Sequence, residues 1–157
     1  MNKNILGAVF FLGAALMGVP SGAGAQVLAV ATLEGTYQQL VNSSSWQEIY
    51  VKQGGTSLQF TTDADNERVV ITYSASCAAL GFIVYVRAKV DGVAASPGAA
   101  GGVDLCYISV SGSTFPASRT FSALISAKGA HSVTIEAKAG GSGAAILIGN
   151  SALVVQH

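Results

Sequence analysis

The stretch Arg68-Val69-Val70-Ile71-Thr72-Tyr73-Ser74-Ala75-Ser76-Cys77 decides the fold of this chain. β-Branched and aromatic residues alternate in it with small polar ones, which is typical of a strand with one face against a core. The other face is only mildly polar, so we expect a central strand with both faces covered. The inward face would carry Val69, Ile71, Tyr73, Ala75 and Cys77.

The chain after residue 25 repeats this pattern in short segments and has no apolar stripe of helical period. About nine or ten such segments recur at the spacing expected of β-sandwiches and barrels. We therefore predict a single all-β domain over residues 26–157, an antiparallel β-sandwich with a jelly roll as the favoured arrangement. The core is expected to contain Val69, Ile71, Tyr73, Phe82, Val84, Val86, Ile108, Phe121, Ile125, Val133, Ile135 and Leu153.

Glycine-containing turn signals predict where strands end. Asp91-Gly92 is typical of a two-residue hairpin turn, because glycine tolerates the positive φ that a type I′ turn requires. Glu34-Gly35 predicts a break between strands at 26–32 and 37–41, and Gly149-Asn150 a tight turn between strands at 144–148 and 151–155. The segment 130–138 is expected to be a half-buried strand with His131 inward and Glu136 towards water.

Residues 1–25 have the pattern of a cleaved secretory signal peptide. Lys3 precedes an apolar run from Ile5 to Val19, and Ala23-Gly24-Ala25 fits the small residues of a cleavage site. A retained membrane helix is the alternative, but the run is shorter than the roughly 20 residues needed to span a bilayer. We expect a secreted or periplasmic protein without membrane insertion after cleavage.

Two cysteines in an exported chain predict one disulfide, Cys77–Cys106, in preference to free thiols or a metal site. The charge balance points away from nucleic acid as a partner. One of the eight Lys and Arg residues lies in the signal segment, which leaves seven scattered cations against eight Asp and Glu residues. Counterion release requires a basic patch, and this pattern provides none.

The closing third of the chain resembles the last strands of secreted and phage-associated jelly-roll sandwiches of the C1q/TNF-like kind. The similarity rests on Gly129 to Ala137, which contains a G-x-H-x-V-x-I strand, and on Gly149 to Val155, which ends in a terminal L-V-V strand. The resemblance implies a two-sheet jelly roll with binding loops and a trimeric assembly. The collagen-like stalk that often precedes such heads has no counterpart in this sequence.

Asp63, Asp65, Asn66 and Glu67 place four oxygen-bearing side chains within five residues. Hard oxygen donors of this kind suit Ca²⁺, and they make this turn the candidate metal site. The segment lacks the glycine and the distal glutamate of an EF-hand loop, so a solvated acidic turn is the favoured interpretation and no cofactor is expected.

Trp46, Glu48 and Tyr50 fall on one face of a strand at period two, with Ile49 and Val51 on the other face. Pyranose faces pack on aromatic rings, so these three residues are the candidate ligand site, with Trp46 exposed and Glu48 as a polar partner. The alternative turns Trp46 into the core, as an ordinary sandwich residue.

No catalytic constellation is visible in the sequence. His131 could act as a general base, but it falls on an apolar strand face, where a hydrogen-bonded structural histidine is the better interpretation. We therefore expect a secreted, non-catalytic binding or interaction module that binds a glycan or another cell-surface protein. The alternative is a structural surface or matrix component that self-associates as a homo-oligomer.

Overall fold

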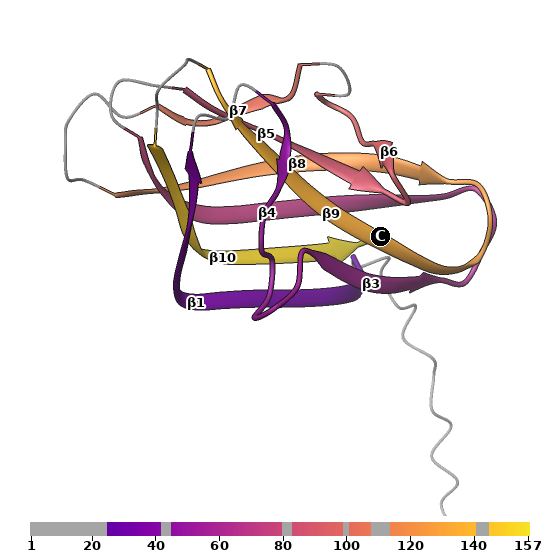
Figure 1. Ribbon diagram of the computed structural model, residues 1–157. Coiled ribbons are helices and arrows are strands. Elements are labelled where there is room, and N and C mark those ends of the chain that lie inside the picture. Colours follow the sequence, from indigo (N-terminus) through magenta and orange to yellow (C-terminus); the bar gives the residue numbers. More distant parts are fainter. Residues whose placement is uncertain (1–24, 42–44, 80–82, 99–100, 108–113, 141–144) are drawn as a thin grey trace, which may run out of the picture.

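The computed structural model describes residues 25–41, 45–79, 83–98, 101–107, 114–140 and 145–157. The described residues form strands and loops, and no helix is present among them. Two antiparallel sheets pack face to face, which confirms the predicted all-β sandwich (Figure 1). The predicted signal peptide and two expected core residues, Phe82 and Ile108, lie outside the described residues.

The first sheet, sheet A, has four strands in the order β1-β10-β4-β8. The strands are β1 (Val27–Val41), β10 (Ala145–Gln156), β4 (Glu67–Ala79) and β8 (Phe115–Ile125). The stretch that decides the fold is part of β4, one of the two inner strands of this sheet, which pairs with β10 on one side and β8 on the other. Its inward residues are buried, and Val70, Thr72, Ser74 and Ser76 on its outer face are half-buried.

The second sheet, sheet B, has β9 and β5 at its centre. The strand β9 (Gly129–Ala139) pairs with β5 (Ile83–Val90) along most of its length. Two short strands pair with the far side of β9, and two pair with the far side of β5. These are β2 (Gln47–Glu48), β3 (Ser57–Thr62), β6 (Val93–Ala94) and β7 (Val103–Tyr107).

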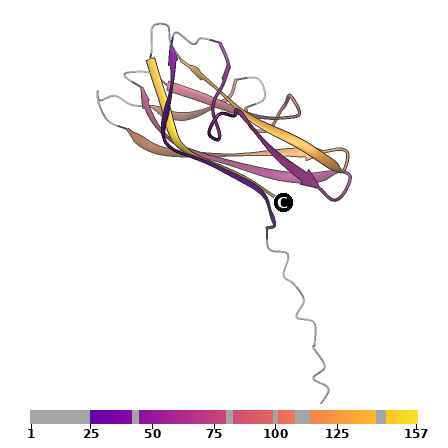
Figure 2. The same cartoon turned by 60° about the horizontal axis from the view of Figure 1, so that its bottom comes forward.

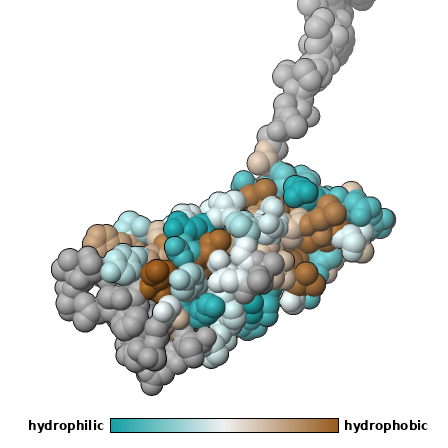
Figure 3. All heavy atoms as spheres, turned by 90° about the horizontal axis from the view of Figure 1, so that it is seen from above, coloured by the Kyte–Doolittle hydropathy of each residue, from teal (hydrophilic) through white to brown (hydrophobic). Residues whose placement is uncertain are grey.

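The core lies between the sheets and consists of alternate residues from both. All of the expected core residues that the structure describes are buried, and Ile49, Val51, Phe60 and Leu105 join them. Some large apolar side chains remain at the surface, including Val93 and Leu124. On the face seen in Figure 3, apolar residues reach the surface in separate patches among hydrophilic ones.

The predicted strand breaks at Gly35 and Gly149-Asn150 are wrong. β1 and β10 each run through these positions, and their pairing changes register there, between Leu33 and Tyr37. The positive φ angles that indicated turns belong to bulges that face each other, with φ of 66° at Gly35 and 47° at Asn150. Both strands bend sharply together as a result (Figures 1 and 2).

The predicted hairpin at Asp91-Gly92 is confirmed. Val90 pairs with Val93 across the turn, and φ is 49° at Asp91 and 82° at Gly92. Positive φ at both central residues is the signature of a type I′ turn. The hairpin connects β5 to β6 at the edge of sheet B.

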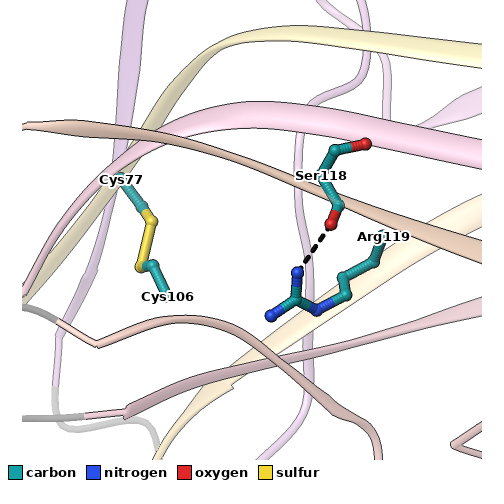
Figure 4. The surroundings of a disulfide bond; sticks show 4 residues. All are labelled: Cys77, Cys106, Ser118 and Arg119. Carbon is teal, nitrogen blue, oxygen red and sulfur yellow. Dashed lines mark hydrogen bonds between the residues drawn. A yellow bond between two sulfur atoms is a disulfide. The ribbon is translucent and has the colours of Figure 1, made fainter.

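The predicted disulfide between Cys77 and Cys106 is present, with Cα atoms 6.7 Å apart (Figure 4). Cys77 belongs to β4 of sheet A and Cys106 to β7 of sheet B, so the bond joins the two sheets across the core. Beside it, the Arg119 side chain donates a 2.7 Å hydrogen bond to the backbone oxygen of Ser118. The disulfide therefore holds the two sheets together where β7 of sheet B passes over β4 of sheet A.

Candidate functional site

Trp46 directly precedes β2 and is half-buried. The guanidinium carbon of Arg87 is 4.4 Å from the centroid of the indole, and Nζ of Lys138 is 4.6 Å from it. Both distances are within the range in which a cation is attracted to the ring quadrupole. The indole is therefore held against two cations rather than projecting freely, which makes it less exposed than the sequence suggested.

Strand register explains why these residues meet. Glu48 of β2 is opposite Glu136 of β9, and Glu136 is opposite Arg87 of β5. Trp46 precedes this row by two residues, which brings its ring over the outer face of sheet B. Its far edge reaches Gly102, where an added Cβ would lie 2.3 Å from Cη2 of the indole. The ring thus spans sheet B from β2 to the residue before β7.

Glu136 anchors Arg87, one of the two cations that lie against the indole. Its carboxylate accepts hydrogen bonds from Nε of Arg87, at 2.5 Å, and Nζ of Lys89, at 2.8 Å. Burial alone would raise the pKa of Glu136, but the hydrogen bonds from Lys89 and Arg87 outweigh it and hold the pKa below its ordinary value. The expectation that Glu136 faces water is wrong: it lies on the outer side of the sheet but is only 7% exposed.

Glu48 and Tyr50 lie on the same side of the segment as Trp46, and Ile49 and Val51 are buried on the other, as the alternation predicted. The side chains of the two candidate residues are exposed. Glu48 accepts a 2.9 Å hydrogen bond from the Thr56 hydroxyl. The side chain of Gln38 of β1 fixes the backbone of this segment. Its Oε1 accepts a 2.8 Å hydrogen bond from the Tyr50 N–H, and its Nε2 donates to the backbone oxygen of Glu48 at 3.3 Å.

We name the residues Trp46, Arg87, Lys89, Glu136 and Lys138 the indole cluster. The sequence singled out only Trp46 among them, because pairing between distant strands brings the others to it. Tyr85 also borders the cluster, since Nζ of Lys138 is 5.6 Å from its ring centroid. The sequence signal for this cluster was that charged residues alternate along both strands, Arg87 with Lys89 and Glu136 with Lys138. That signal indicates a cluster only when the register between β5 and β9 is known.

The acidic turn uses its carboxylates to hold its own backbone. Glu67 Oε2 accepts from the N–H groups of Asp63 and Ala64, at 3.2 and 3.3 Å. Asp65 Oδ1 accepts from the Lys128 N–H at 2.8 Å, and Asn66 adopts a φ of 57°. In the part of the chain that the structure describes, no three His, Cys, Asp or Glu side chains gather as metal ligands. The three candidate carboxylates, Asp63, Asp65 and Glu67, therefore do not form such a group.

Glu67 also connects this turn to the C-terminus. Its Oε1 lies 2.7 Å from Nδ1 of His157. The backbone of His157 is itself paired with that of Gln26, through hydrogen bonds of 2.7 and 3.0 Å. The acidic turn therefore fixes the end of β10 against the start of β4.

His131 is hydrogen-bonded through both ring nitrogens. Its Nδ1 is 2.7 Å from Asp91 Oδ2, and its Nε2 donates to the Ala127 oxygen at 2.9 Å. Its ring packs against Phe60, with centroids 5.5 Å apart.

Asp91 joins His131 to the hairpin turn. Its Oδ1 accepts from the Ser132 N–H at 2.8 Å. Burial alone would raise the pKa of Asp91, but the hydrogen bonds from His131 and Ser132 outweigh it and lower the pKa. The pair thus ties the β5–β6 turn to β9.

Comparison of the chain with protein-family models, with curated proteins and with solved structures gives no match. Within the described residues, no helix has the length and apolar character needed to cross a membrane. Fold and site therefore define the protein by class alone, as an antiparallel β-sandwich whose two sheets are joined by a disulfide.

Proposed function

We propose that this protein is an exported, non-catalytic carbohydrate-binding module and that the indole cluster is its binding platform. The observation that carries the proposal is the stacking of Trp46 against Arg87 and Lys138. A ring fixed in this way loses little conformational freedom when a ligand packs on it. Its half-exposed surface offers an apolar area to the C–H face of a pyranose.

Polar groups around the ring support a sugar as the ligand. Lys138 borders the indole, and the exposed side chains of Glu48 and Tyr50 come from the same strand segment. An ammonium, a carboxylate and a phenol together can donate to and accept from sugar hydroxyl groups. An apolar plate with a few polar groups at its rim is the general pattern of small-molecule sites.

The arrangement of strands and the disulfide support the remaining parts of the proposal. We infer a jelly roll, because the first strand pairs with the last and the chain crosses repeatedly from one sheet to the other. A disulfide is compatible with an oxidising extracellular or periplasmic compartment. Cleavage of residues 1–25 as a signal peptide is part of the same proposal.

Trp46 is the only tryptophan of the chain, so its fluorescence reports on the platform alone. The experiment is a glycan array followed by fluorescence titration with each bound oligosaccharide. We expect saturable quenching or enhancement, and a loss of affinity of about tenfold in Trp46→Ala, measured by calorimetry. Phe115→Ala removes an exposed aromatic of sheet A and serves as the matched control. Unchanged affinity in Trp46→Ala, or no glycan bound, would overturn the proposal.

A second candidate, self-association as a structural component, is favoured by the outer face of sheet A. Two rows of uncharged residues cross all four strands there. Rows without charge can meet the same rows of a second copy without placing like charges together. The rows are Val30-Val154-Thr72-Thr120 and Thr32-Ala152-Ser74-Ser118.

The oligomeric state tests this second candidate. Light scattering after size exclusion should give a multiple of the chain mass for the wild type and the monomer mass for Val154→Glu, which places a carboxylate in the middle of the face. Gln59→Glu, at an exposed position of β3 in sheet B, is the control. A wild-type protein that is monomeric at high concentration would eliminate self-association through this face.

A further inference from the structure

The edges of the two sheets meet at one backbone bridge and then separate. Ser96, after β6, and Ser122 of β8 exchange two backbone hydrogen bonds, of 2.9 and 2.6 Å. Continued pairing would place Ala94 opposite Leu124, but the bridge is isolated, and Ala94 is paired on its β5 side with Lys89 and not with Leu124. The separation leaves a groove of about 600 Å³ between β6 and the end of β8.

β8 presents an open strand edge to this groove. In an antiparallel strand the N–H and C=O groups of alternate residues point to the same side. Ser122 points away from β4, towards Ser96, so the backbone groups of Leu124 point the same way. No β6 residue pairs with Leu124, because the bridge is a single residue pair. The groove therefore has a donor and an acceptor along one wall.

The walls are mainly apolar. Val93 and Leu124 line the groove and are 73% and 61% exposed, with Ala95 and Ile125 at its inner side. Large apolar side chains at this exposure, next to an open strand edge, are usually protected or used for pairing with another chain. The groove is thus suited to a second strand that carries an apolar side chain.

The charged groups at the groove indicate which side chains a partner strand would need. Two carboxylate or guanidinium groups line the groove, those of Arg68 and Asp91. The Asp91 carboxylate is already engaged by His131 and Ser132. Arg68 pairs with Leu124 across β4 and β8, so its exposed side chain stands beside the open edge. An incoming strand with an acidic side chain next to its apolar one would complement the groove.

We propose that this groove binds an extended peptide segment of another protein, added as a strand to the β8 edge. Backbone hydrogen bonds to Leu124 hold the peptide, an apolar side chain enters between Val93 and Ile125, and a neighbouring carboxylate meets Arg68. Strand addition of this kind combines sequence-independent backbone pairing with side-chain specificity. This site is separate from the indole cluster and does not depend on the proposed glycan binding.

The test uses the full mature protein and the capped peptide Thr-Val-Glu-Val-Thr. We expect saturable shifts of the amide resonances of Leu124 and Ala94, with a dissociation constant below about 1 mM. Arg68→Gln should weaken binding of this peptide two- to fivefold or so and leave its Gln analogue unaffected, as for an exposed ion pair. The control is a peptide of the same sequence and length in which the amides facing β8 are N-methylated, and this peptide should not bind.

Leu124→Pro tests the backbone wall directly. The substitution removes an N–H that points away from β4, so the β4–β8 ladder is kept, whereas Leu124→Val keeps the donor. We expect the proline variant to lose binding and the valine variant to retain it. Should the proline variant not fold, the N-methylated peptide decides alone. The proposal is overturned by absence of saturable binding, by binding of the N-methylated peptide at equal affinity, or by shifts confined to another strand edge.

Discussion

The backbone N–H of Gly35 donates a 2.8 Å hydrogen bond to Oδ1 of Asn150, 115 residues further along the chain. The Asn150 Nδ2 donates in turn to the hydroxyl of Tyr37, also at 2.8 Å. One asparagine side chain thus joins the two facing bulges of β1 and β10. The bend that these strands share depends on this contact and on the close approach of Gly149 to Thr36. A Cβ added to Gly149 would lie 2.2 Å from the backbone oxygen of Thr36.

Substitutions of Asn150 should separate backbone strain from hydrogen bonding. Asn150→Gly keeps the positive φ but removes both side-chain hydrogen bonds, so we expect a loss of about 1 kcal/mol in the free energy of unfolding. Asn150→Ala adds the strain of a left-handed residue with a Cβ, and the loss should reach about 2–3 kcal/mol. Urea denaturation of both variants measures the difference. If the two variants are equally stable, the positive φ at residue 150 causes no measurable strain in alanine.

Local patterns in the sequence were sufficient for the sandwich, but not for the bulges. Alternation in β4 depends on residues close in the chain, and Asp91-Gly92 contains its whole turn, so both could be predicted. Gly35 and Asn150 carry the same local signal as a turn, since each favours positive φ. Whether that signal produces a turn or a bulge depends on the strand opposite, which lies more than 100 residues away.

The platform around Trp46 shows the same limit for the candidate site. Period two correctly separated Trp46, Glu48 and Tyr50 from Ile49 and Val51. The exposure of Trp46 depends on Arg87 and Lys138, which reach it only through the register of three strands. Glu136 was misplaced for the same reason, because its burial results from its cationic neighbours on β5.

Gly102→Ala should displace the indole without substituting any residue of the indole cluster. The added methyl would lie 2.3 Å from Cη2 of Trp46, and the φ of 73° at Gly102 disfavours alanine. We expect a red shift of the tryptophan emission and a loss of about 1–2 kcal/mol in the free energy of unfolding. Gly101→Ala, where an added Cβ meets nothing within 4 Å, is the control. An unchanged emission spectrum in Gly102→Ala would contradict the packing of Trp46 against this glycine.

The disulfide should account for a large part of the stability. It closes a loop of 29 residues between the sheets, and on the chain-entropy model its removal costs about 3–4 kcal/mol. The double variant Cys77→Ala and Cys106→Ala should therefore unfold at a clearly lower urea concentration. Reductant should destabilise the wild type to a similar degree and leave the double variant unchanged. A wild type indifferent to reductant would mean that the bond contributes little.

The two carboxylates with lowered pKa values, Asp91 and Glu136, predict the acid response of the fold. Each is stabilised in its charged form, so its contribution is present above its unfolded pKa of about 4 and is lost as the pH falls through the lower folded value. We expect the urea midpoint to fall steeply below about pH 4. Glu136→Gln should lower stability near neutral pH by about 2 kcal/mol, since it leaves Arg87 and Lys89 without their shared partner. Its urea midpoint should also fall less steeply with decreasing pH than that of the wild type. If the two midpoints fall equally steeply, Glu136 does not cause the loss of stability in acid, and Asp91→Asn then tests the other carboxylate.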